Sequence, residues 1–146
     1  MKNITPKLLS FLDHYSTYII ASHKEPDGDS IGSSLALNLL LKKKGKNTIL
    51  VSAGPFKRPE IKQYESLFET RVKPQQMTSD TAVLIIDCSS IDRLGDAAQG
   101  LESLPYSIID HHATNDDLNE TNYIDPKSPA TALLIQQIIE KVQGHL

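Results

Sequence analysis

Residues 81–87 read TAVLIID: six uncharged residues, rich in β-branched side chains, that end on a carboxylate. Two further runs share this pattern. Residues 18–21 (YIIA) lead to His23, and residues 106–109 (YSII) lead to Asp110. Continuous apolar strands of this kind are typical of a parallel sheet that is covered on both faces. Residues 81–87 therefore predict the most hydrophobic strand of an α/β fold.

Helical segments alternate with these strands. The clearest helix spans residues 30–44, where Ser30 or Asp29 can cap the start. The other expected elements are short helices at 8–12 and 59–67, a strand at 48–51, a short strand near 122–126 and a last helix at 131–142, whose start Ser128 or Thr131 would cap. The βαβα order predicts a doubly wound domain, with a mostly parallel sheet and helices on both faces.

The composition limits the class of protein. The chain has 146 residues, a formal net charge of −3 and one cysteine, Cys88. Its length suits a single domain, and one cysteine excludes an intramolecular disulfide. The nearly balanced charge gives no reason to expect binding to long duplex DNA. No uncharged run is long enough to cross a bilayer and no secretory pattern begins the chain, so we expect a cytoplasmic protein without a membrane partner.

Titratable side chains gather where the predicted strands end. The carboxyl ends of parallel strands meet at one edge of a sheet, so these side chains should converge. They are His23, Asp27, Asp29, Asp87, Asp110, His111 and His112. A preference of aspartate for turns explains any one of them about as well, but not the whole set. Crowded carboxylates repel one another unless a cation lies between them, so the convergence predicts a metal site.

The types of ligand side chain limit which metal ions are expected. Carboxylates and imidazoles without thiolate suit Mn²⁺, with Zn²⁺, Fe²⁺ or Mg²⁺ as less favoured ions. The set is too large for one tetrahedral ion and fits two, with Asp87 as the bridge and a shared water as the nucleophile. The helix that begins near Ser30 would point its N-terminus at the same edge, which favours an anion. We therefore expect metal-assisted hydrolysis at phosphorus.

Three motifs resemble those of the DHH phosphoesterases, in the order found in that family. Residues 109–112 (IDHH) resemble the motif that names the family, residues 23–32 (HKEPDGDSIG) resemble its first motif, and Asp87 with residues 93–95 (RLG) resembles its second. The resemblance runs from about residue 16 to residue 142. Within the family, residues 26–29 (PDGD) are most similar to the first motif of the nanoRNA nucleases and 3′-phosphoadenosine 5′-phosphate phosphatases.

The resemblance implies a role for each metal ligand. His23 and Asp27 would hold one Mn²⁺, Asp29 and His111 would hold the other, and Asp87 would bridge both.

The resemblance also implies residues that handle the substrate. His112 would contact the scissile phosphate, and Asp110 would orient the histidines. By their positions near these motifs, Asn115 and Arg93 are further candidates for substrate binding. The expected substrate is a short oligoribonucleotide or a nucleotide phosphate, and the expected assembly is either a monomer or a homodimer.

Family members carry a fourth aspartate motif and a C-terminal substrate-binding domain, and residues 1–146 would end before both. We therefore expect one DHH domain of a longer enzyme, and the main alternative is a metal-binding fragment without activity. Cyclic-dinucleotide phosphodiesterase, pyrophosphatase and exopolyphosphatase activities are further alternatives. A phosphoacceptor receiver module fits less well, because its last strand should end in lysine where residues 110–112 (DHH) stand.

Overall fold

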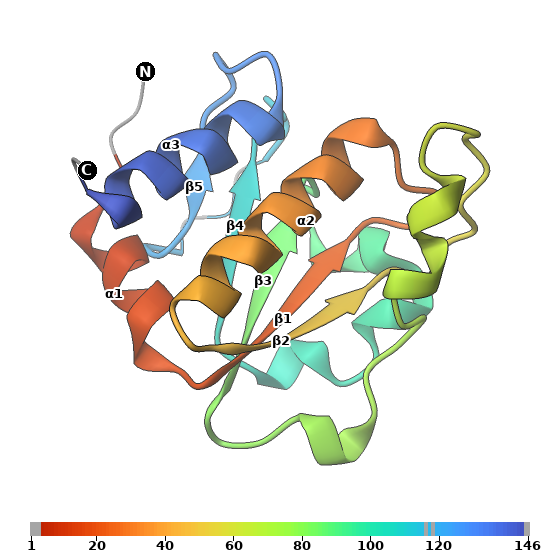
Figure 1. The fold of residues 1–146 in the computed structure, drawn as a ribbon, viewed down its shortest axis with the longest axis horizontal. Coiled ribbons are helices and arrows are strands. Elements are labelled where there is room, and N and C mark those ends of the chain that lie inside the picture. Colours follow the sequence, from red (N-terminus) through yellow and green to blue (C-terminus); the bar gives the residue numbers. More distant parts are fainter. Residues whose placement is uncertain (1–3, 116, 118, 145–146) are drawn as a thin grey trace.

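A parallel sheet forms the centre of the protein in a computed structural model, which describes residues 4–115, 117 and 119–144. Its strands are β1 (Thr17–Ser22), β2 (Asn47–Val51), β3 (Thr81–Ile86), β4 (Tyr106–Asp110) and β5 (Tyr123–Ile124). Neighbouring strands pair in parallel in the order β2-β1-β3-β4-β5 (Figure 1). The predicted α/β class is confirmed, and each strand lies within two residues of its expected place.

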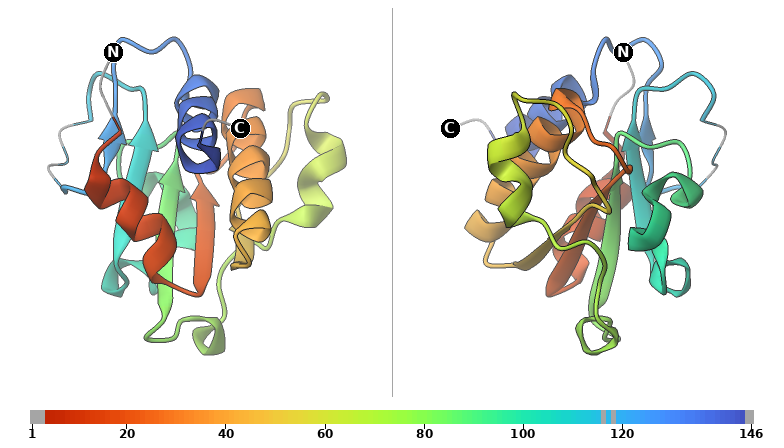
Figure 2. Two further views of the ribbon diagram at one scale, coloured as in Figure 1. Left: turned by 60° about the vertical axis from the view of Figure 1, so that its left-hand side comes forward. Right: turned by 90° about the vertical axis from the view of Figure 1, so that its right-hand side faces the viewer.

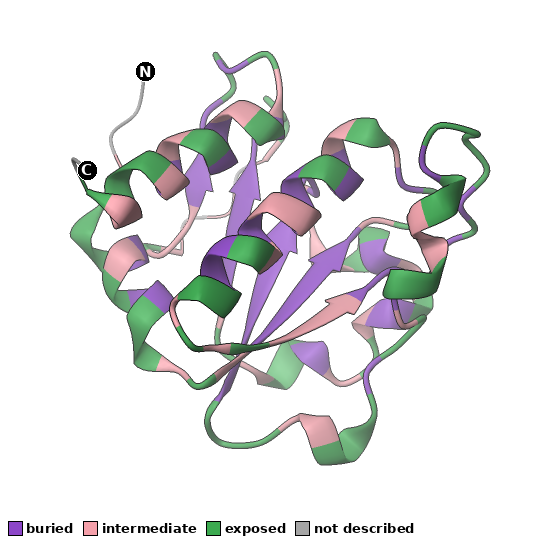
Figure 3. Ribbon diagram, in the orientation of Figure 1, coloured by how far each residue is buried: buried purple, intermediate pink, exposed green. Residues whose placement is uncertain are grey.

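Three α-helices cover one face of the sheet (Figures 1 and 2). They are α1 (Pro6–His14), α2 (Gly28–Lys43) and α3 (Thr131–Gln143). Their apolar side chains pack on those of the strands in one core, which includes Tyr18, Leu37, Leu84 and Ile138. Figure 3 shows the buried residues concentrated in the strands and on the inner sides of these helices. None of the described helices has the length and hydropathy needed to cross a membrane.

The opposite face is covered by 3₁₀ helices rather than α-helices. Here η3 (Ile91–Ala98) and η4 (Leu101–Ser103) pack against the strands, and Leu94 and Leu101 join Ile85 in a second core. Helices therefore lie on both faces as expected, but they are α-helices on only one of them.

The segment between β2 and β3 also departs from the sequence prediction. An α-helix was expected at residues 59–67, whereas the structure has a 3₁₀ helix, η1 (Lys62–Leu67), followed by η2 (Pro74–Gln76). No residue of η1 is buried. A short helix depends on packing of an apolar face for its stability, so this segment lacks what would extend it as an α-helix.

The N-terminus of α2 is capped two or three residues earlier than expected. Ser30 and Asp29 were the predicted caps, but Asp27 holds that position. The Ser30 backbone N–H donates to Asp27 Oδ1 at 2.9 Å, and the Asp27 N–H donates to Ser30 Oγ at 3.1 Å. This reciprocal capping box leaves Asp29 inside the first turn of α2, where its side chain reaches other elements.

The chain leaves β1 and β3 toward opposite faces of the sheet, through α2 and η3 respectively. In a sheet of this strand order, the ends of these two neighbouring strands form the switch point at which α/β proteins bind ligands. The fold thus places the predicted site residues after β1 and β3 at the position where a binding crevice is expected.

Candidate metal centre

Asp87 lies at the centre of the site, directly after β3. The residue is 3% exposed and has a φ of 58°, in the left-handed region. Its backbone N–H donates to the Ile109 carbonyl at 2.9 Å, which fixes the turn against β4. A residue other than glycine pays about 1–2 kcal/mol for this conformation, and such strain persists where the surroundings enforce it, often at functional sites.

Two histidines from different strand ends face the two oxygens of Asp87. His23 Nε2 lies 3.8 Å from Oδ2, and His111 Nε2 lies 3.4 Å from Oδ1. Two donors bound to one ion at about 2.1 Å each are separated by about 3.0–3.4 Å when they subtend 90–109°. The separation of His111 from Asp87 falls within this range, and that of His23 from Asp87 lies about 0.4 Å above it.

The ring of His23 has a defined orientation. Its Nδ1 lies 2.8 Å from the Lys24 carbonyl, which assigns the proton to Nδ1 and leaves the lone pair of Nε2 facing Asp87. The pKa of His23 is raised, chiefly by the Asp87 carboxylate, while burial acts in the opposite direction. A metal at this position would therefore compete with a proton for Nε2.

Two groups of possible ligand atoms share Asp87. The first comprises His23, Asp27 and Asp87, and the second comprises Asp87, His111 and His112; within each group the atoms lie within 4.8 Å of one another. The first group contains the predicted ligands of one ion. The second contains His111 as predicted, together with His112, for which a contact with substrate was predicted.

Asp29, predicted to hold the second ion, accepts hydrogen bonds from two backbone N–H groups of α3. Its Oδ2 accepts the backbone N–H of Thr131 at 3.0 Å, and its Oδ1 accepts that of Ala132 at 2.9 Å. The residue before α3, Ala130, provides no side-chain cap, so a carboxylate from α2 caps this helix. His111 Nε2 nevertheless lies 3.5 Å from Asp29 Oδ2, so Asp29 also borders the second group.

Thr131 contacts the candidate metal centre, which the sequence did not predict. It is fully buried, and its hydroxyl donates to Asp87 Oδ1 at 2.9 Å. The sequence suggested only that Thr131 or Ser128 would cap α3, whereas the Ser128 hydroxyl donates to the Ala130 carbonyl. A polar residue at the start of a helix gave no signal that it would contact an aspartate 44 positions away.

Asp110 is buried at the end of β4 and holds two side chains. Its Oδ1 accepts a hydrogen bond from Nδ1 of His112, which directs the half-exposed imidazole so that Nε2 is free for another partner. Its Oδ2 accepts from Asn115 Nδ2 at 3.1 Å, and Asn115 Oδ1 accepts the N–H of Asp117. Both ends of the Asn115 amide thus have partners within the protein, which gives Asn115 a positioning contact.

Arg93, the other predicted substrate contact, lies in η3, the 3₁₀ helix that follows β3. Its carbonyl accepts the N–H of Lys24 at 3.0 Å, so the segments that follow β1 and β3 are joined beside Asp87. The side chains of Arg93 and Lys24 are both exposed. Gly95 has a φ of 64°, and a Cβ there would lie 3.4 Å from Lys24 Cδ. Two exposed cations therefore border the candidate metal centre and would favour an anionic ligand.

Cys88 does not provide a nucleophile. It is buried, its Sγ donates to the Ser90 carbonyl at 2.9 Å, and burial raises the pKa of the thiol to about 11. A thiol with that pKa stays protonated at neutral pH.

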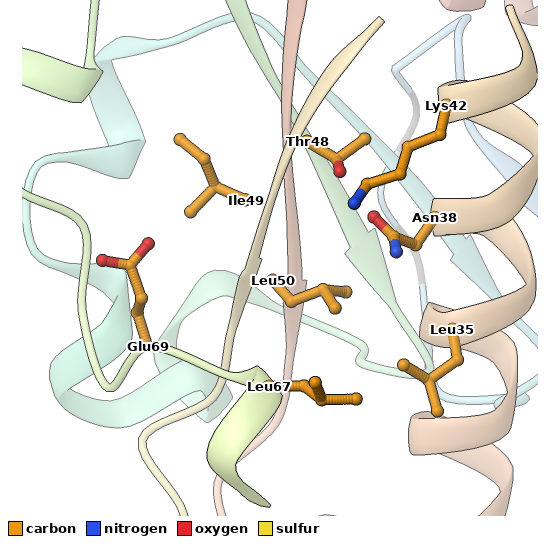
Figure 4. A pocket seen from close by; sticks show the side chains of 8 residues that line it. All are labelled: Leu35, Asn38, Lys42, Thr48, Ile49, Leu50, Leu67 and Glu69. Atoms are coloured by element: carbon orange, nitrogen blue, oxygen red, sulfur yellow. The ribbon is translucent and has the colours of Figure 1, made fainter. Parts of the chain in front are cut away.

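A hollow of about 250 Å³ lies away from these strand ends, between α2 and the edge strand β2. Figure 4 shows its apolar part, formed by Leu35, Leu50 and Leu67, below the side chains of Asn38 and Lys42. It brings together no group of His, Cys, Asp or Glu ligands among the described residues. The possible metal ligands lie instead at the ends of β1, β3 and β4.

Comparison with known proteins identifies the class to which this arrangement belongs. The model of the DHH family, N-terminal domain, matches residues 17–145, and the chain therefore belongs to this family. A solved structure of similar fold is an exopolyphosphatase-related protein from Bacteroides fragilis, with a TM-score of 0.75, 20% identity, and coverage of 97% of this chain and 45% of that chain.

Two curated relatives have assigned activities. The bifunctional oligoribonuclease and PAP phosphatase NrnA of Thermus thermophilus is 32% identical over 125 residues, which cover 83% of this chain and 36% of the relative. The cyclic-di-AMP phosphodiesterase GdpP of Bacillus subtilis is 24% identical over an alignment of 151 positions. This alignment covers 94% of this chain and 23% of the relative. The chain thus spans little more than a third of NrnA and less than a quarter of GdpP.

Proposed function

We propose that this domain carries the metal centre of a phosphoesterase that hydrolyses short oligoribonucleotides or 3′-phosphoadenosine 5′-phosphate with two divalent ions, preferably Mn²⁺. The observation that carries the proposal is the position of Asp87. One buried carboxylate belongs to two groups of ligand atoms, and histidines from two strand ends face its two oxygens. This is the arrangement expected of a carboxylate that bridges two ions.

The chain offers each ion a set of donors. His23 and Asp27 would hold one ion together with Asp87, while His111 would hold the other with Asp87 and either Asp29 or His112. Only Oδ1 of Asp27 is used in capping α2, so its second oxygen remains available. When bound, the two ions would supply a nucleophilic water near neutral pH and charge stabilisation for the phosphoryl group.

The remaining side chains would bind and protonate the substrate. The His112 side chain is half-exposed, and its Nδ1–H donates to Asp110, which fixes the orientation and the tautomer of the imidazole. In its protonated form, His112 would donate a proton from Nε2 to the oxygen that leaves phosphorus when the ester bond breaks. Lys24 and Arg93 would attract the phosphate.

The choice of substrate rests on the similarity to NrnA and on the PDGD sequence of residues 26–29. The matches to GdpP from Bacillus subtilis and Geobacillus thermodenitrificans support a second candidate, hydrolysis of a cyclic dinucleotide. An oligoribonucleotide and a cyclic dinucleotide would both place a phosphodiester of ribonucleotides at the same centre.

Hydrolysis assays with the purified protein test this proposal. With Mn²⁺ we expect cleavage of a diribonucleotide, of 3′-phosphoadenosine 5′-phosphate or of bis-p-nitrophenyl phosphate, and loss of this activity together with Mn²⁺ binding in Asp87→Ala. Asp96→Asn, an exposed aspartate of η3, is the matched control and should change neither. Absence of both Mn²⁺ binding and hydrolysis in the unmodified protein would refute the proposal.

A further inference from the structure

A second hollow, of about 310 Å³, lies on the face of the sheet that η3 and η4 cover. The right-hand view of Figure 2 shows these 3₁₀ helices on the side of the sheet away from α2 and α3. Ile85 of β3 and Ile108 of β4, neighbours in the sheet register, form its buried floor. Tyr106 also lines it, so the hollow offers a largely apolar surface and an aromatic ring.

This hollow is lined by residues that closely follow the candidate metal centre in the chain. Ser89 and Ser90 line it, and they follow Asp87 by only two and three residues, so the Cα atoms of Ser89 and Asp87 lie within about 7.6 Å. Asp117 also lines it, and its N–H donates to Asn115, which in turn donates to Asp110. The segment that follows β3 and the segment that follows β4 therefore both border the hollow.

The charges around the hollow disfavour an anionic group inside it. Its lining contains two carboxylates, Glu102 and Asp117, and no Lys, Arg or His. Asp117 already accepts hydrogen bonds from the Tyr106 hydroxyl at 2.9 Å and from Asn122 at 2.8 Å. Glu102 is exposed and makes no ion pair or side-chain hydrogen bond with the part of the chain that the structure describes. The free acceptor is thus Glu102, at the rim of an apolar surface.

We propose that this hollow binds the base of the nucleotide whose phosphate lies at the metal centre. A nucleobase is flat, packs well on aromatic and aliphatic side chains, and carries N–H donors at its edge. Glu102 accepts a hydrogen bond from the exocyclic amino group, which cytosine, adenine and guanine have and uracil lacks. The inference rests on the proposed function and adds to it a preference for nucleotides over phosphate esters without a base.

Calorimetric titrations of the Mn²⁺-loaded protein with CMP, UMP and ribose 5-phosphate test this proposal. We expect CMP to bind about tenfold more tightly than ribose 5-phosphate, which has the phosphate but no base. UMP, close to CMP in size, should bind with an intermediate affinity. Ile91→Trp, at a half-buried lining position, should fill the hollow and reduce the affinity for CMP to that for ribose 5-phosphate.

Glu102→Gln isolates the hydrogen bond. An amide both donates and accepts, so this variant should lose the preference for CMP over UMP while still binding ribose 5-phosphate as the unmodified protein does. Glu60→Gln makes the same change at an exposed glutamate that does not line the hollow, and it should leave all three affinities unchanged.

The outcomes separate this proposal from the function on which it rests. Equal affinities of the unmodified protein for CMP and ribose 5-phosphate would overturn the base site and leave the phosphate site intact. An unchanged ratio of CMP to UMP affinity in Glu102→Gln would overturn the role of Glu102. Failure of ribose 5-phosphate itself to bind would instead count against the phosphoesterase centre.

Discussion

Asp29 and Thr131 join the first turns of α2 and α3: Asp29 Oδ2 accepts the Thr131 backbone N–H at 3.0 Å across 102 residues of sequence. Thr131 continues this connection, because its hydroxyl donates to Asp87. A carboxylate at a helix N-terminus is stabilised by the helix dipole, and it satisfies amide groups that otherwise have no partner. The packing of α3 on α2 and the arrangement of the candidate metal ligands therefore depend on the same side chains.

Replacement of Asp29 should destabilise the protein even without metal. Asp29→Ala removes acceptors for two N–H groups of α3, and loss of a helix cap costs about 0.5–2 kcal/mol of unfolding free energy. Urea denaturation in the presence of EDTA measures this loss, with Asp96→Asn as an exposed control that should stay within about 0.5 kcal/mol of the unmodified protein. If relief of carboxylate repulsion were the larger effect, Asp29→Ala would be the more stable protein.

The Thr131 hydroxyl should influence Mn²⁺ binding without being a ligand. Thr131→Val keeps the branched shape but leaves Asp87 Oδ1 without its donor, whereas Thr131→Ser keeps the hydroxyl. Loss of a group that orients a ligand lowers metal affinity by about 10–100-fold, so we expect such a loss for valine and near-normal affinity for serine. Titration calorimetry with Mn²⁺ measures both. A purely structural role would lower the thermal stability of the valine variant and leave its metal affinity unchanged.

Much of this architecture could be predicted because it is encoded locally. The apolar runs at 18–21, 81–86 and 106–109 predicted the positions of three strands. Parallel strands bring their carboxyl ends to one edge of the sheet, whichever segments connect them. The cap of α3 could not be predicted, because its partners are 102 positions apart and meet only through the packing of α2 on α3. The left-handed backbone of Asp87 likewise depends on β4, to which its N–H donates.

Replacement of Asp110 should affect turnover more than substrate binding. Asp110→Asn keeps the size of a fully buried side chain but no longer fixes the orientation of the His112 ring or which of its nitrogens carries the proton. We expect kcat for bis-p-nitrophenyl phosphate to fall by about 10–100-fold with a smaller change in KM. Steady-state kinetics at saturating Mn²⁺ test this, with Asp96→Asn as the control. Equal losses in Mn²⁺ affinity and kcat would show that Asp110 acts on the metal rather than on His112.

The raised pKa of His23 gives the metal-free protein a defined pH dependence. The Asp87 carboxylate is the main cause of the shift from 6.5, so the folded protein binds this proton more tightly than the unfolded chain. The resulting stabilisation is fully present below the unfolded pKa of about 6.5 and is lost as pH rises through the higher pKa of the folded state. Urea denaturation in EDTA from pH 5.5 to 8.5 should show this decline, and His23→Gln should remove it. Mn²⁺ binding should have the opposite pH dependence, because the metal must displace the proton from His23. The Mn²⁺ affinity of the unmodified protein should therefore increase from pH 5.5 to 8.5. A Mn²⁺ affinity that does not change with pH in this interval would show that His23 is not a ligand.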